Sequence, residues 1–442
     1  MKIHILGICG TFMGGLARIL VQSGHTVSGS DYQFYPPMSD QLKDLDLRLI
    51  SGYAADQLPQ ADLYIIGNNL SRGNESVEKI LDKNFPYQSG PRMLGSILQD
   101  RKVVAISGTH GKTTTTSLIV HLFKEAGIDV GFLIGGVCNN LKHSAHLGSD
   151  DIFVIEADEY DSAFFDKRSK FIHYNPSTLI VNNIEFDHAD IFSNLTEIQK
   201  QFHHILKIMP KTGVVFGFGD DQNVSEVLDM GLWCDKQILQ QNDKDFGYIL
   251  DPFTIFKNGK EYAGNNNLLP LDGSHNKKNM IMAVQVAASE GLSINKCLNN
   301  LQSFQGVKRR LEHVGNFGGK TIYDDFAHHP TAVRGSIEAI VTKFPEQKLL
   351  AIVEAGSNTM TSGHHNESLN DIAADFDVCW LDTSKSPMIN SMPKINESFF
   401  GSHADLEAEM KDKFKDYDIF LIMTNRDSQK IIQPLIRLCA DD

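Results

Sequence analysis

The segment of residues 103–114 restricts the possible folds of this chain more than any other. Four apolar residues lead into a turn with two glycines, and Lys112 and Thr113 then open a segment of helical character. Glycines let backbone N–H groups approach an anion closely, and the amino terminus of a helix adds a partial positive charge. Lys112 can reach nucleotide phosphates, and the Thr113 hydroxyl can ligate Mg²⁺. The segment therefore predicts a phosphate-binding loop between a strand and a helix.

This loop is a shortened form of the usual nucleotide-binding pattern G-x-x-x-x-G-K-[ST]. Ile106 stands where the first glycine of that pattern is expected. Because Gly-Lys-Thr also arises by chance, an ordinary turn between a strand and a helix is the alternative. The preceding strand and the run of four threonines favour phosphate binding. The residues that we expect to contact the nucleotide in this loop are Gly108, Thr109, His110, Gly111, Lys112, Thr113 and Thr114.

The length, charge and cysteine pattern of the chain limit the kinds of protein that it can be. A chain of 442 residues corresponds to roughly three domains of ~150 residues each. The net charge of −14 disfavours non-specific binding to nucleic acid or to an anionic membrane. The six cysteines are scattered without a Cys-x-x-Cys pair, which indicates reduced thiols in the cytoplasm. The sequence has no apolar run of ~20 residues, so we expect no membrane-spanning helix.

The first hundred residues read as an α/β unit with a glycine turn after its first strand. Apolar residues 3–6 precede a glycine-rich turn and a helical pattern, and a second strand ends at Asp31. This order predicts a βαβ unit with a backbone-lined diphosphate site and a hydroxyl-binding acid. A non-binding domain, in which the glycines only permit tight packing, is the alternative. The turn residues that we expect to bind substrate are Cys9, Gly10, Thr11, Phe12 and Met13.

A further strand in this part of the chain, residues 61–67, is followed by the polar residues Asn68 and Arg72. Open α/β sheets bind ligands just beyond the carboxyl ends of their strands. Arg72 can therefore meet a phosphate or carboxylate, although a solvated surface arginine is an equal alternative.

Two strands in the middle of the chain end in charged residues. Residues 151–155 run into Glu156, Asp158 and Glu159, whose mutual repulsion is costly unless a cation is bound. In a protein with a phosphate-binding loop, this is the expected place for a Mg²⁺ ligand. Residues 177–181 run into a cluster that includes His188 and Asp190, and His188 is the candidate ligand of a second metal ion.

Later segments add further candidates for nucleotide binding. His275, Asn276 and Asn279 lie at the start of a helix that we expect over residues 280–288, where they can cap the helix or face a base. Arg310 belongs to a small basic patch in an acidic protein, which favours a phosphate or ribose contact.

The last third of the chain predicts a third α/β unit. Residues 320–325, 349–354 and 419–423 are apolar strands, and the first of them ends at Asp325. His328 and His329 follow just before Pro330, which is typical of the first turn of a helix. Asn358 lies in a polar loop after the second strand and is a candidate for substrate binding.

Together these segments resemble the Mur ligase family, the ATP-dependent amide-forming enzymes of peptidoglycan synthesis. The matching stretches occur in family order: residues 108–113, 156–159, 183–190, 273–279, 309–312 and 324–330. The resemblance implies three domains: an N-terminal Rossmann-like domain (1–101), a central P-loop ATPase-like domain (102–314) and a C-terminal Rossmann-like domain (315–442). Within the family, residues 8–15, 159–171 and 357–360 look like the branch that attaches a recycled tripeptide to UDP-N-acetylmuramate.

The resemblance also implies a mechanism. The muramyl carboxylate would attack the γ-phosphate of ATP, and the amine of L-alanyl-γ-D-glutamyl-meso-diaminopimelate would then attack the acyl phosphate. Lys112 would hold phosphates, Thr113 and Glu156 one Mg²⁺, and His188 a second. The glycine turn would bind the UDP group. The nucleotide contacts outside the loop would be His275, Asn276, Asn279, Arg310 and Asp325, and the residues near the reacting centre and the peptide would be His328, His329 and Asn358.

Three positions depart from the family members that we would compare. His203 stands where several members carry a carbamylated lysine, and Gly356 stands where an arginine is expected. The segment 423–428 replaces a glycine-rich loop, and its Arg426 is a candidate to supply the missing positive charge. We expect a monomer or weak homodimer.

Other functions compatible with the sequence are addition of free L-alanine to UDP-N-acetylmuramate and nucleotide-dependent binding without ligation. An oxidoreductase that uses the N-terminal unit is disfavoured, because its glycine spacing is not the dinucleotide pattern G-x-G-x-x-G.

Overall fold

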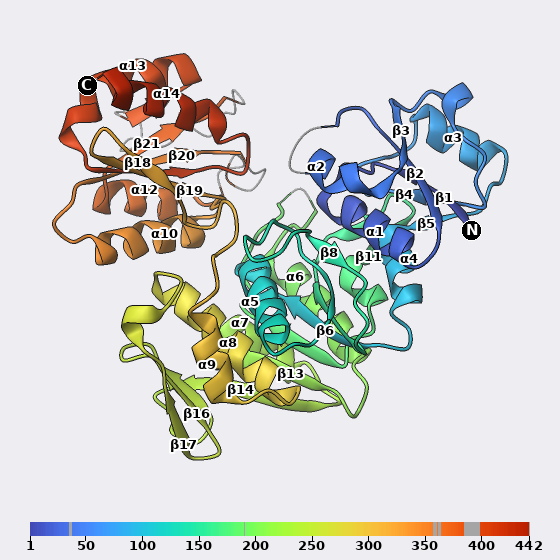
Figure 1. Cartoon of the computed structure of the whole chain (residues 1–442), viewed down its shortest axis with the longest axis horizontal. Helices are drawn as coiled ribbons and strands as arrows, with labels where there is room; N and C mark the ends of the chain where they lie inside the picture. The colour runs from blue at the N-terminus through green and yellow to red at the C-terminus, as the bar shows by residue number, and fades with distance from the viewer. Residues whose placement is uncertain (35–37, 190, 357–359, 361–363, 384–397, 442) are drawn as a thin grey trace. The chain divides into compact units, whose positions relative to one another are not determined.

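The computed structural model describes residues 1–34, 38–189, 191–356, 360, 364–383 and 398–441 (Figure 1). These residues form two compact units. The first contains Met1–Glu185, Thr196–Pro270 and Asn279–Gln305, and the second contains Phe186–Leu195, Leu271–Lys278 and Gly306–Asp442. Each unit is described separately below. Asn358 and Asp190 lie outside the described residues.

The first unit opens with a parallel five-stranded sheet of order β3-β2-β1-β4-β5. The order reverses at β1, so the crevice at its carboxyl end is the place where such sheets bind ligands. The glycine turn that follows β1 lies there and leads into α1, as the sequence predicted. The elements of this part are β1 (Lys2–Leu6), α1 (Thr11–Gln22), β2 (Thr26–Asp31), α2 (Met38–Leu42), β3 (Arg48–Ser51), β4 (Leu63–Ile66), α3 (Glu75–Asp82), β5 (Tyr87–Ser89) and α4 (Gly90–Ile97).

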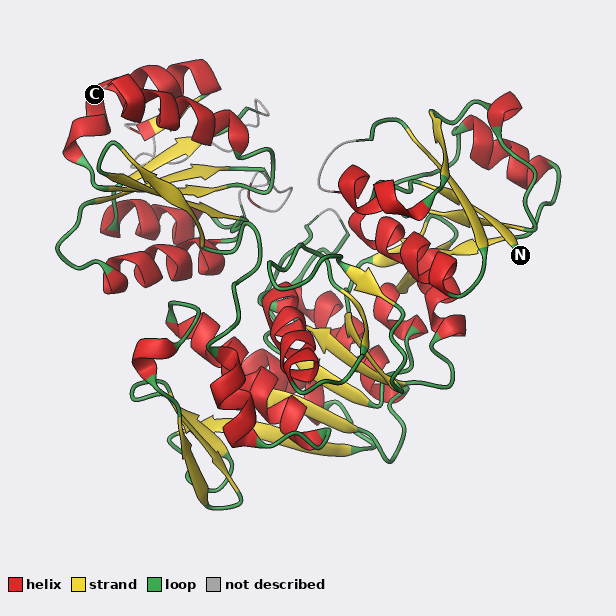
Figure 2. Ribbon diagram, in the orientation of Figure 1, coloured by secondary structure: helices red, strands yellow, loops and turns green. Residues whose placement is uncertain are grey.

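The same unit contains a ten-stranded sheet of order β17-β16-β15-β14-β13-β12-β6-β9-β7-β8, whose strands are yellow in Figure 2. At its centre β6 pairs in parallel with both β12 and β9, so the carboxyl ends of these three strands meet at one edge. Its strands are β6 (Lys102–Ser107), β7 (Gly131–Leu133), β8 (Ala145–His146), β9 (Ile152–Glu156), β12 (Thr178–Val181), β13 (Val214–Phe218), β14 (Asp235–Gln241), β15 (Gly247–Ile249), β16 (Thr254–Lys257) and β17 (Lys260–Ala263).

The helices associated with this sheet include α5, which directly follows the predicted phosphate-binding loop. Helix α8 begins at Ser274 and not at residue 280, so His275, Asn276 and Asn279 lie inside its first turns. We expected a later start because apolar residues begin only at Met280. The helices are α5 (Lys112–Glu125), α6 (Leu195–Lys207), α7 (Gln222–Asp229), α8 (Ser274–Ser289) and α9 (Ile294–Leu301).

The second unit is built on a six-stranded sheet of order β18-β19-β23-β20-β21-β22, in which only β18 runs antiparallel. Helices α10 and α12 lie on one face of this sheet, and α13 and α14 lie on the other (Figure 1). Alternate side chains of β20 enter separate cores: Ala351 and Val353 pack with residues of α10 and α12, and Leu350 and Ile352 with residues of α13 and α14. The elements are β18 (Glu312–Phe317), β19 (Lys320–Asp325), α10 (Pro330–Lys343), β20 (Leu349–Glu354), α12 (Asn366–Asp375), β21 (Val378–Leu381), β22 (Phe399–Phe400), α13 (His403–Lys413), β23 (Ile419–Met423) and α14 (Gln429–Asp441).

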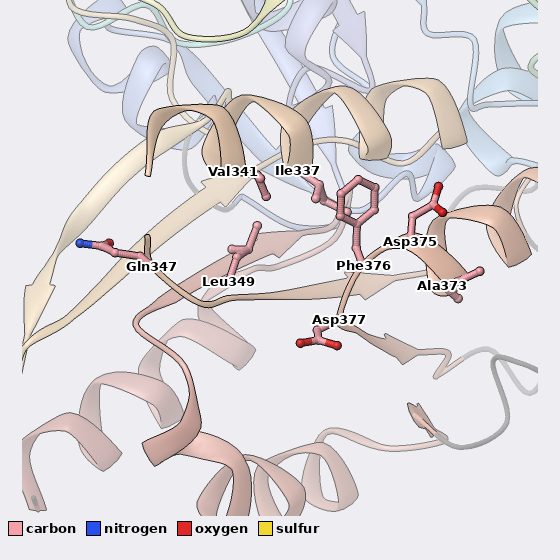
Figure 3. Close-up of a pocket in the computed structure, with 9 residues that line it drawn as sticks. Ile337, Val341, Gln347, Leu349, Ala373, Asp375, Phe376 and Asp377 are labelled. Carbon is pink, nitrogen blue, oxygen red and sulfur yellow. The ribbon is translucent and has the colours of Figure 1, made fainter. Parts of the chain in front are cut away.

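A pocket of about 300 Å³ lies beside α10 and the end of α12, lined in part by Ile337, Leu349 and Phe376 (Figure 3). Leu349 is the first residue of β20, whereas Glu354 is its last. The pocket therefore opens at the amino-terminal end of this strand, opposite the edge where α/β sheets bind substrates.

Within the described residues, no helix is both long enough and apolar enough to cross a membrane. Three α/β parts are present, and they have the Rossmann-like, P-loop ATPase-like and Rossmann-like characters that the sequence predicted.

Candidate functional site

The predicted phosphate-binding loop joins β6 to α5, and its two glycines have backbone conformations that other residues rarely adopt. The φ angles are +130° at Gly108 and +82° at Gly111. A Cβ atom on Gly111 would lie 2.6 Å from both the Asn182 Nδ2 and the Asn279 Oδ1 atoms. Both the backbone angle and the close neighbours therefore require glycine at position 111.

Two asparagines after β12 hold this loop in place. The Asn183 Oδ1 atom accepts a 2.7 Å hydrogen bond from the His110 N–H, and Asn182 Nδ2 donates to the His110 carbonyl oxygen at 2.9 Å. The Thr109 N–H donates to the Asn183 carbonyl oxygen at 3.1 Å. We did not predict this role, although two polar residues directly after a buried strand were a signal for it.

Asn279 is buried behind the loop, where its side chain is part of the same network. Its Oδ1 atom accepts hydrogen bonds from Thr115 Oγ1 and Asn182 Nδ2, both at 3.2 Å. This position supports the loop from α8. The contact with nucleotide that we predicted for Asn279 remains a prediction.

The ammonium group of Lys112 lies among oxygen atoms. It donates to the Gly108 carbonyl oxygen at 2.7 Å and to Glu159 Oε2 at 3.2 Å, and Asp158 Oδ1 is 3.8 Å away. Burial alone would lower the pKa of Lys112. The attraction of the Glu159 and Asp158 carboxylates is larger than this effect, so the pKa is raised overall. The ammonium is therefore charged, as phosphate binding requires.

The carboxylates at the end of β9 and directly after it have different immediate partners. Glu156 accepts a 2.7 Å hydrogen bond from the Gly135 N–H, Asp158 pairs with Lys170 at 2.8 Å, and the Glu159 side chain is only 2% exposed. Carboxylate oxygens, and hydroxyl oxygens such as that of Thr113 in the first turn of α5, are the hard oxygen donors that Mg²⁺ prefers. The donor chemistry of this part of the first unit thus fits the predicted metal ion.

Asp31, the last residue of β2, fixes the glycine turn that follows β1. One of its carboxylate oxygens accepts the Cys9 N–H at 2.9 Å, and the other accepts the Tyr32 N–H at 2.8 Å. The turn leads into α1 at Thr11, and Gly10 provides no side-chain cap for the first N–H groups of that helix. N–H groups at the amino terminus of a helix can bind an anion, and the diphosphate contact at this turn remains a prediction.

The remaining candidates after β4 lie on the surface. Asn68 is exposed, and the Arg72 guanidinium forms two hydrogen bonds of 2.9 Å with the Glu78 carboxylate. Of the two possibilities left open for Arg72, this geometry matches the solvated surface arginine.

In the second unit, His188 has a left-handed backbone conformation with φ +59°. Such angles are strained for a residue other than glycine and are frequent at functional sites. Its N–H donates to Asp187 Oδ1 at 2.7 Å, and its side chain is 15% exposed.

Asp325, at the end of β19, is bonded to its own flanking loops. One carboxylate oxygen accepts the Leu311 N–H and the other the Ala327 N–H, both at 2.6 Å. The Cζ atoms of Arg309 and Arg310 each lie 5.1 Å from the centroid of the Phe326 ring. Asp325 therefore shapes the turn that carries both arginines, which sequence reasoning did not foresee.

Three histidines complete the candidates of this unit. His329 is buried before α10, and its Nε2 atom lies 3.2 Å from the Phe186 carbonyl oxygen. His328 Nδ1 lies 2.8 Å from the Phe326 carbonyl oxygen. His275 is exposed in the first turn of α8, beside Gly335 of α10, and Asn276 Nδ2 donates to the Asp272 carbonyl oxygen at 2.8 Å.

A Gly111→Ala variant tests the loop geometry. We expect its affinity for ATP to fall by about tenfold or more, because the added methyl group meets the two asparagines. Isothermal titration calorimetry measures this affinity. Gly127→Ala is the matched control, since Gly127 has a similar φ of +79° at the end of the same helix but no atom within 4 Å. Equal affinities of the two variants would contradict the steric requirement.

Asp324 gives a pH-dependent prediction. Burial raises its pKa from 3.8 to about 6. Between about pH 4 and pH 6 the native state keeps the Asp324 proton, whereas the unfolded state loses it. The contribution of this protonated carboxyl group to the free energy of unfolding is therefore fully present below about pH 4 and is lost as the pH rises through about 6. We expect Asp324→Asn to gain in melting temperature relative to the wild type as the pH rises from about 4 to 7.

Asn can still accept the hydrogen bond that the Ser428 hydroxyl gives to Asp324. Asp416→Asn, at an exposed position, is the control. If the difference in melting temperature between Asp324→Asn and the wild type stays constant across this pH range, the buried carboxyl group does not titrate as described.

Comparison of the sequence with protein-family models assigns all three parts of the chain to one family. Three family models match: the catalytic domain of the Mur ligase family over residues 2–102, the Mur ligase middle domain over 106–287 and the Mur ligase glutamate ligase domain over 309–423.

Two curated relatives are UDP-N-acetylmuramate–L-alanyl-γ-D-glutamyl-meso-2,6-diaminoheptandioate ligases. The Escherichia coli K12 protein is 48% identical over 82% of this chain and 80% of its own length. The Haemophilus influenzae protein is 46% identical over 83% of this chain and 82% of its own length. The crystal structure of a murein peptide ligase from Psychrobacter arcticus is similar over 100% of this chain and 99% of its own, with 38% identity and a TM-score of 0.77. This chain belongs to the Mur ligase family of ATP-dependent ligases.

Proposed function

We propose that this chain joins L-alanyl-γ-D-glutamyl-meso-diaminopimelate to the lactoyl carboxylate of UDP-N-acetylmuramate, in peptidoglycan recycling in the cytoplasm. The observation that carries the proposal is the 48% identity to a ligase of this name over four fifths of both chains. The three domains would be residues 1–101 for the UDP group, 102–314 for ATP and 315–442 for the peptide.

The proposed reaction has two steps. The carboxylate oxygen of UDP-N-acetylmuramate attacks the γ-phosphorus of ATP, which forms an acyl phosphate and releases ADP. The α-amine of the tripeptide then attacks the acyl carbon, loses a proton, and expels inorganic phosphate. Such phosphoryl transfer depends mainly on alignment and on neutralisation of charge.

Residues of the phosphate-binding loop would supply most of this neutralisation. The Lys112 ammonium would leave the Glu159 and Asp158 carboxylates and bind ATP phosphates, together with N–H groups of the loop. Thr113 and Glu156 would hold one Mg²⁺, and His188 a second. Bound Mg²⁺ would neutralise phosphate charge. Arg310 and Asp325 would position the nucleotide, and His328 would lie near the reacting centre.

The peptide acceptor carries carboxylates, and we propose that Arg426 binds one of them. The Arg426 Nη1 atom donates to Thr383 Oγ1 at 2.5 Å and lies 3.7 Å from Glu354 Oε1. These residues lie at the carboxyl ends of β20, β21 and β23, where α/β sheets bind ligands. A Cβ atom on Gly356 would collide with Asn425 and lie 3.2 Å from Arg426 Nε. Arg426 therefore fills the space beside residue 356, where related ligases are expected to place an arginine.

Phosphate release from ATP and Mg²⁺ with UDP-N-acetylmuramate tests the proposed function. We expect release with the tripeptide, together with a coupled product of the correct mass, and no release with L-alanine or without acceptor. Chelation of Mg²⁺ should abolish the activity. Release with free L-alanine only would assign the chain to the biosynthetic branch. Absence of release with either acceptor, from folded protein that binds ATP, would favour nucleotide-dependent binding without ligation.

Arg426→Met tests the acceptor site. We expect the KM for the tripeptide to rise by roughly tenfold or more, since a charge-assisted hydrogen bond is lost, while the KM for ATP stays unchanged. Arg426→Lys should recover part of the loss because it keeps the charge without the planar fork. The control is Arg437→Met, at an exposed position of α14. An unchanged tripeptide KM in Arg426→Met would exclude this residue from the acceptor site.

A further inference from the structure

Residues 161–169 form a hairpin to which the proposed reaction assigns no role. Strands β10 (Asp161–Ala163) and β11 (Asp166–Ser169) pair antiparallel, and the Ser162 hydroxyl donates to the Arg168 carbonyl oxygen at 2.9 Å. At the open end of the hairpin, the Lys170 N–H donates to the Tyr160 carbonyl oxygen at 2.8 Å. The hairpin therefore returns Lys170 to the acidic segment that follows β9.

The ammonium group of Lys170 is enclosed at this position. It donates to Asp158 Oδ2 at 2.8 Å and lies 5.5 Å from the centroid of the Tyr160 ring, and the side chain is only 14% exposed. Lysine normally keeps its strongly hydrated ammonium group in water. A buried lysine therefore needs a close anionic partner, and Asp158 provides one.

The Asp158 carboxylate lies between two lysines. Its Oδ2 atom pairs with Lys170, while its Oδ1 atom is 3.8 Å from the Nζ atom of Lys112, the lysine of the phosphate-binding loop. Glu159 also pairs with Lys112, at 3.2 Å. The carboxylates of this segment thus compete with nucleotide phosphates for the Lys112 ammonium group, and Lys170 offsets the charge of one competitor.

We propose that Lys170 is a positioning residue, which neutralises Asp158 and thereby leaves Lys112 available to the phosphates of ATP. Without Lys170, Asp158 would attract Lys112 more strongly and would repel the incoming phosphates. The inference rests on the proposed function only in requiring that ATP binds at this loop. It assigns the hairpin a purpose: to carry a second cation to the acidic segment.

Binding of ATP in the presence of EDTA tests this role by isothermal titration calorimetry. We expect Lys170→Met to weaken metal-free ATP binding by about tenfold, and Lys170→Arg, which keeps the charge, to restore most of the affinity. Lys167→Met is the matched control: Lys167 lies on the same hairpin and pairs with Asp161 at 2.5 Å, but its side chain is 72% exposed. Equal affinities of the Lys170→Met and Lys167→Met variants would overturn the proposal.

A double-mutant cycle separates neutralisation of Asp158 from direct contact with the nucleotide. In an Asp158→Asn background, we expect Lys170→Met to have no further effect on metal-free ATP binding, because no charge remains to be neutralised. A loss of similar size in both backgrounds would overturn the proposal. The comparison of Asp158→Asn with the double variant remains decisive even if Lys170→Met alone fails to fold. Since metal-free binding involves no ligation, a failure here is distinct from a failure of the ligase assay.

Discussion

The interaction on which the nucleotide site depends is the enclosure of the Lys112 ammonium group among carboxylate and carbonyl oxygens. Burial lowers the pKa of Lys112, and the nearby carboxylates of Glu159 and Asp158 raise it above the ordinary value. The same carboxylates would compete with the phosphate groups that we propose this loop binds. In that proposal, Glu159 and Asp158 are the partners of Lys112 until a nucleotide replaces them.

The shape of the loop is fixed by other strands and helices. Asn182 and Asn183 directly follow β12, and Asn279 belongs to α8, yet all three contact the turn between β6 and α5 or the start of α5. Their amide groups satisfy loop polar atoms that burial would otherwise leave without hydrogen bonds. A preformed loop of this kind loses little conformational entropy when an anion binds.

In the second unit, side chains at the ends of strands also hold loops in place by hydrogen bonds to the backbone. Both carboxylate oxygens of Asp325 accept hydrogen bonds from backbone N–H groups. These two bonds stabilise the turn in which Arg309 has φ +59° and Leu311 has φ +48°. The strained turn presents Arg309 and Arg310 beside Phe326. Glu354, Thr383 and Thr424 likewise surround Arg426 at the neighbouring strand ends.

The sequence by itself determined the strands, the turns and the order of the α/β parts. Apolar runs such as residues 103–106 and 419–423 read directly as buried strands, and the structure has β6 and β23 there. The sequence also placed the candidate residues at strand ends, because parallel strands bring their carboxyl ends to one edge of a sheet.

Only the tertiary structure decided which groups meet. It paired Lys112 with Glu159, bonded Asp325 to its own backbone, placed Arg426 beside Gly356 and brought Lys170 back to Asp158. Asn182 bonds His110 of the loop from 72 positions away along the chain, and Asn279 bonds Thr115 from 164 positions away. Local patterns do not encode such contacts, because they depend on the packing of separate strands and helices and on the cost of burying each charge without a partner.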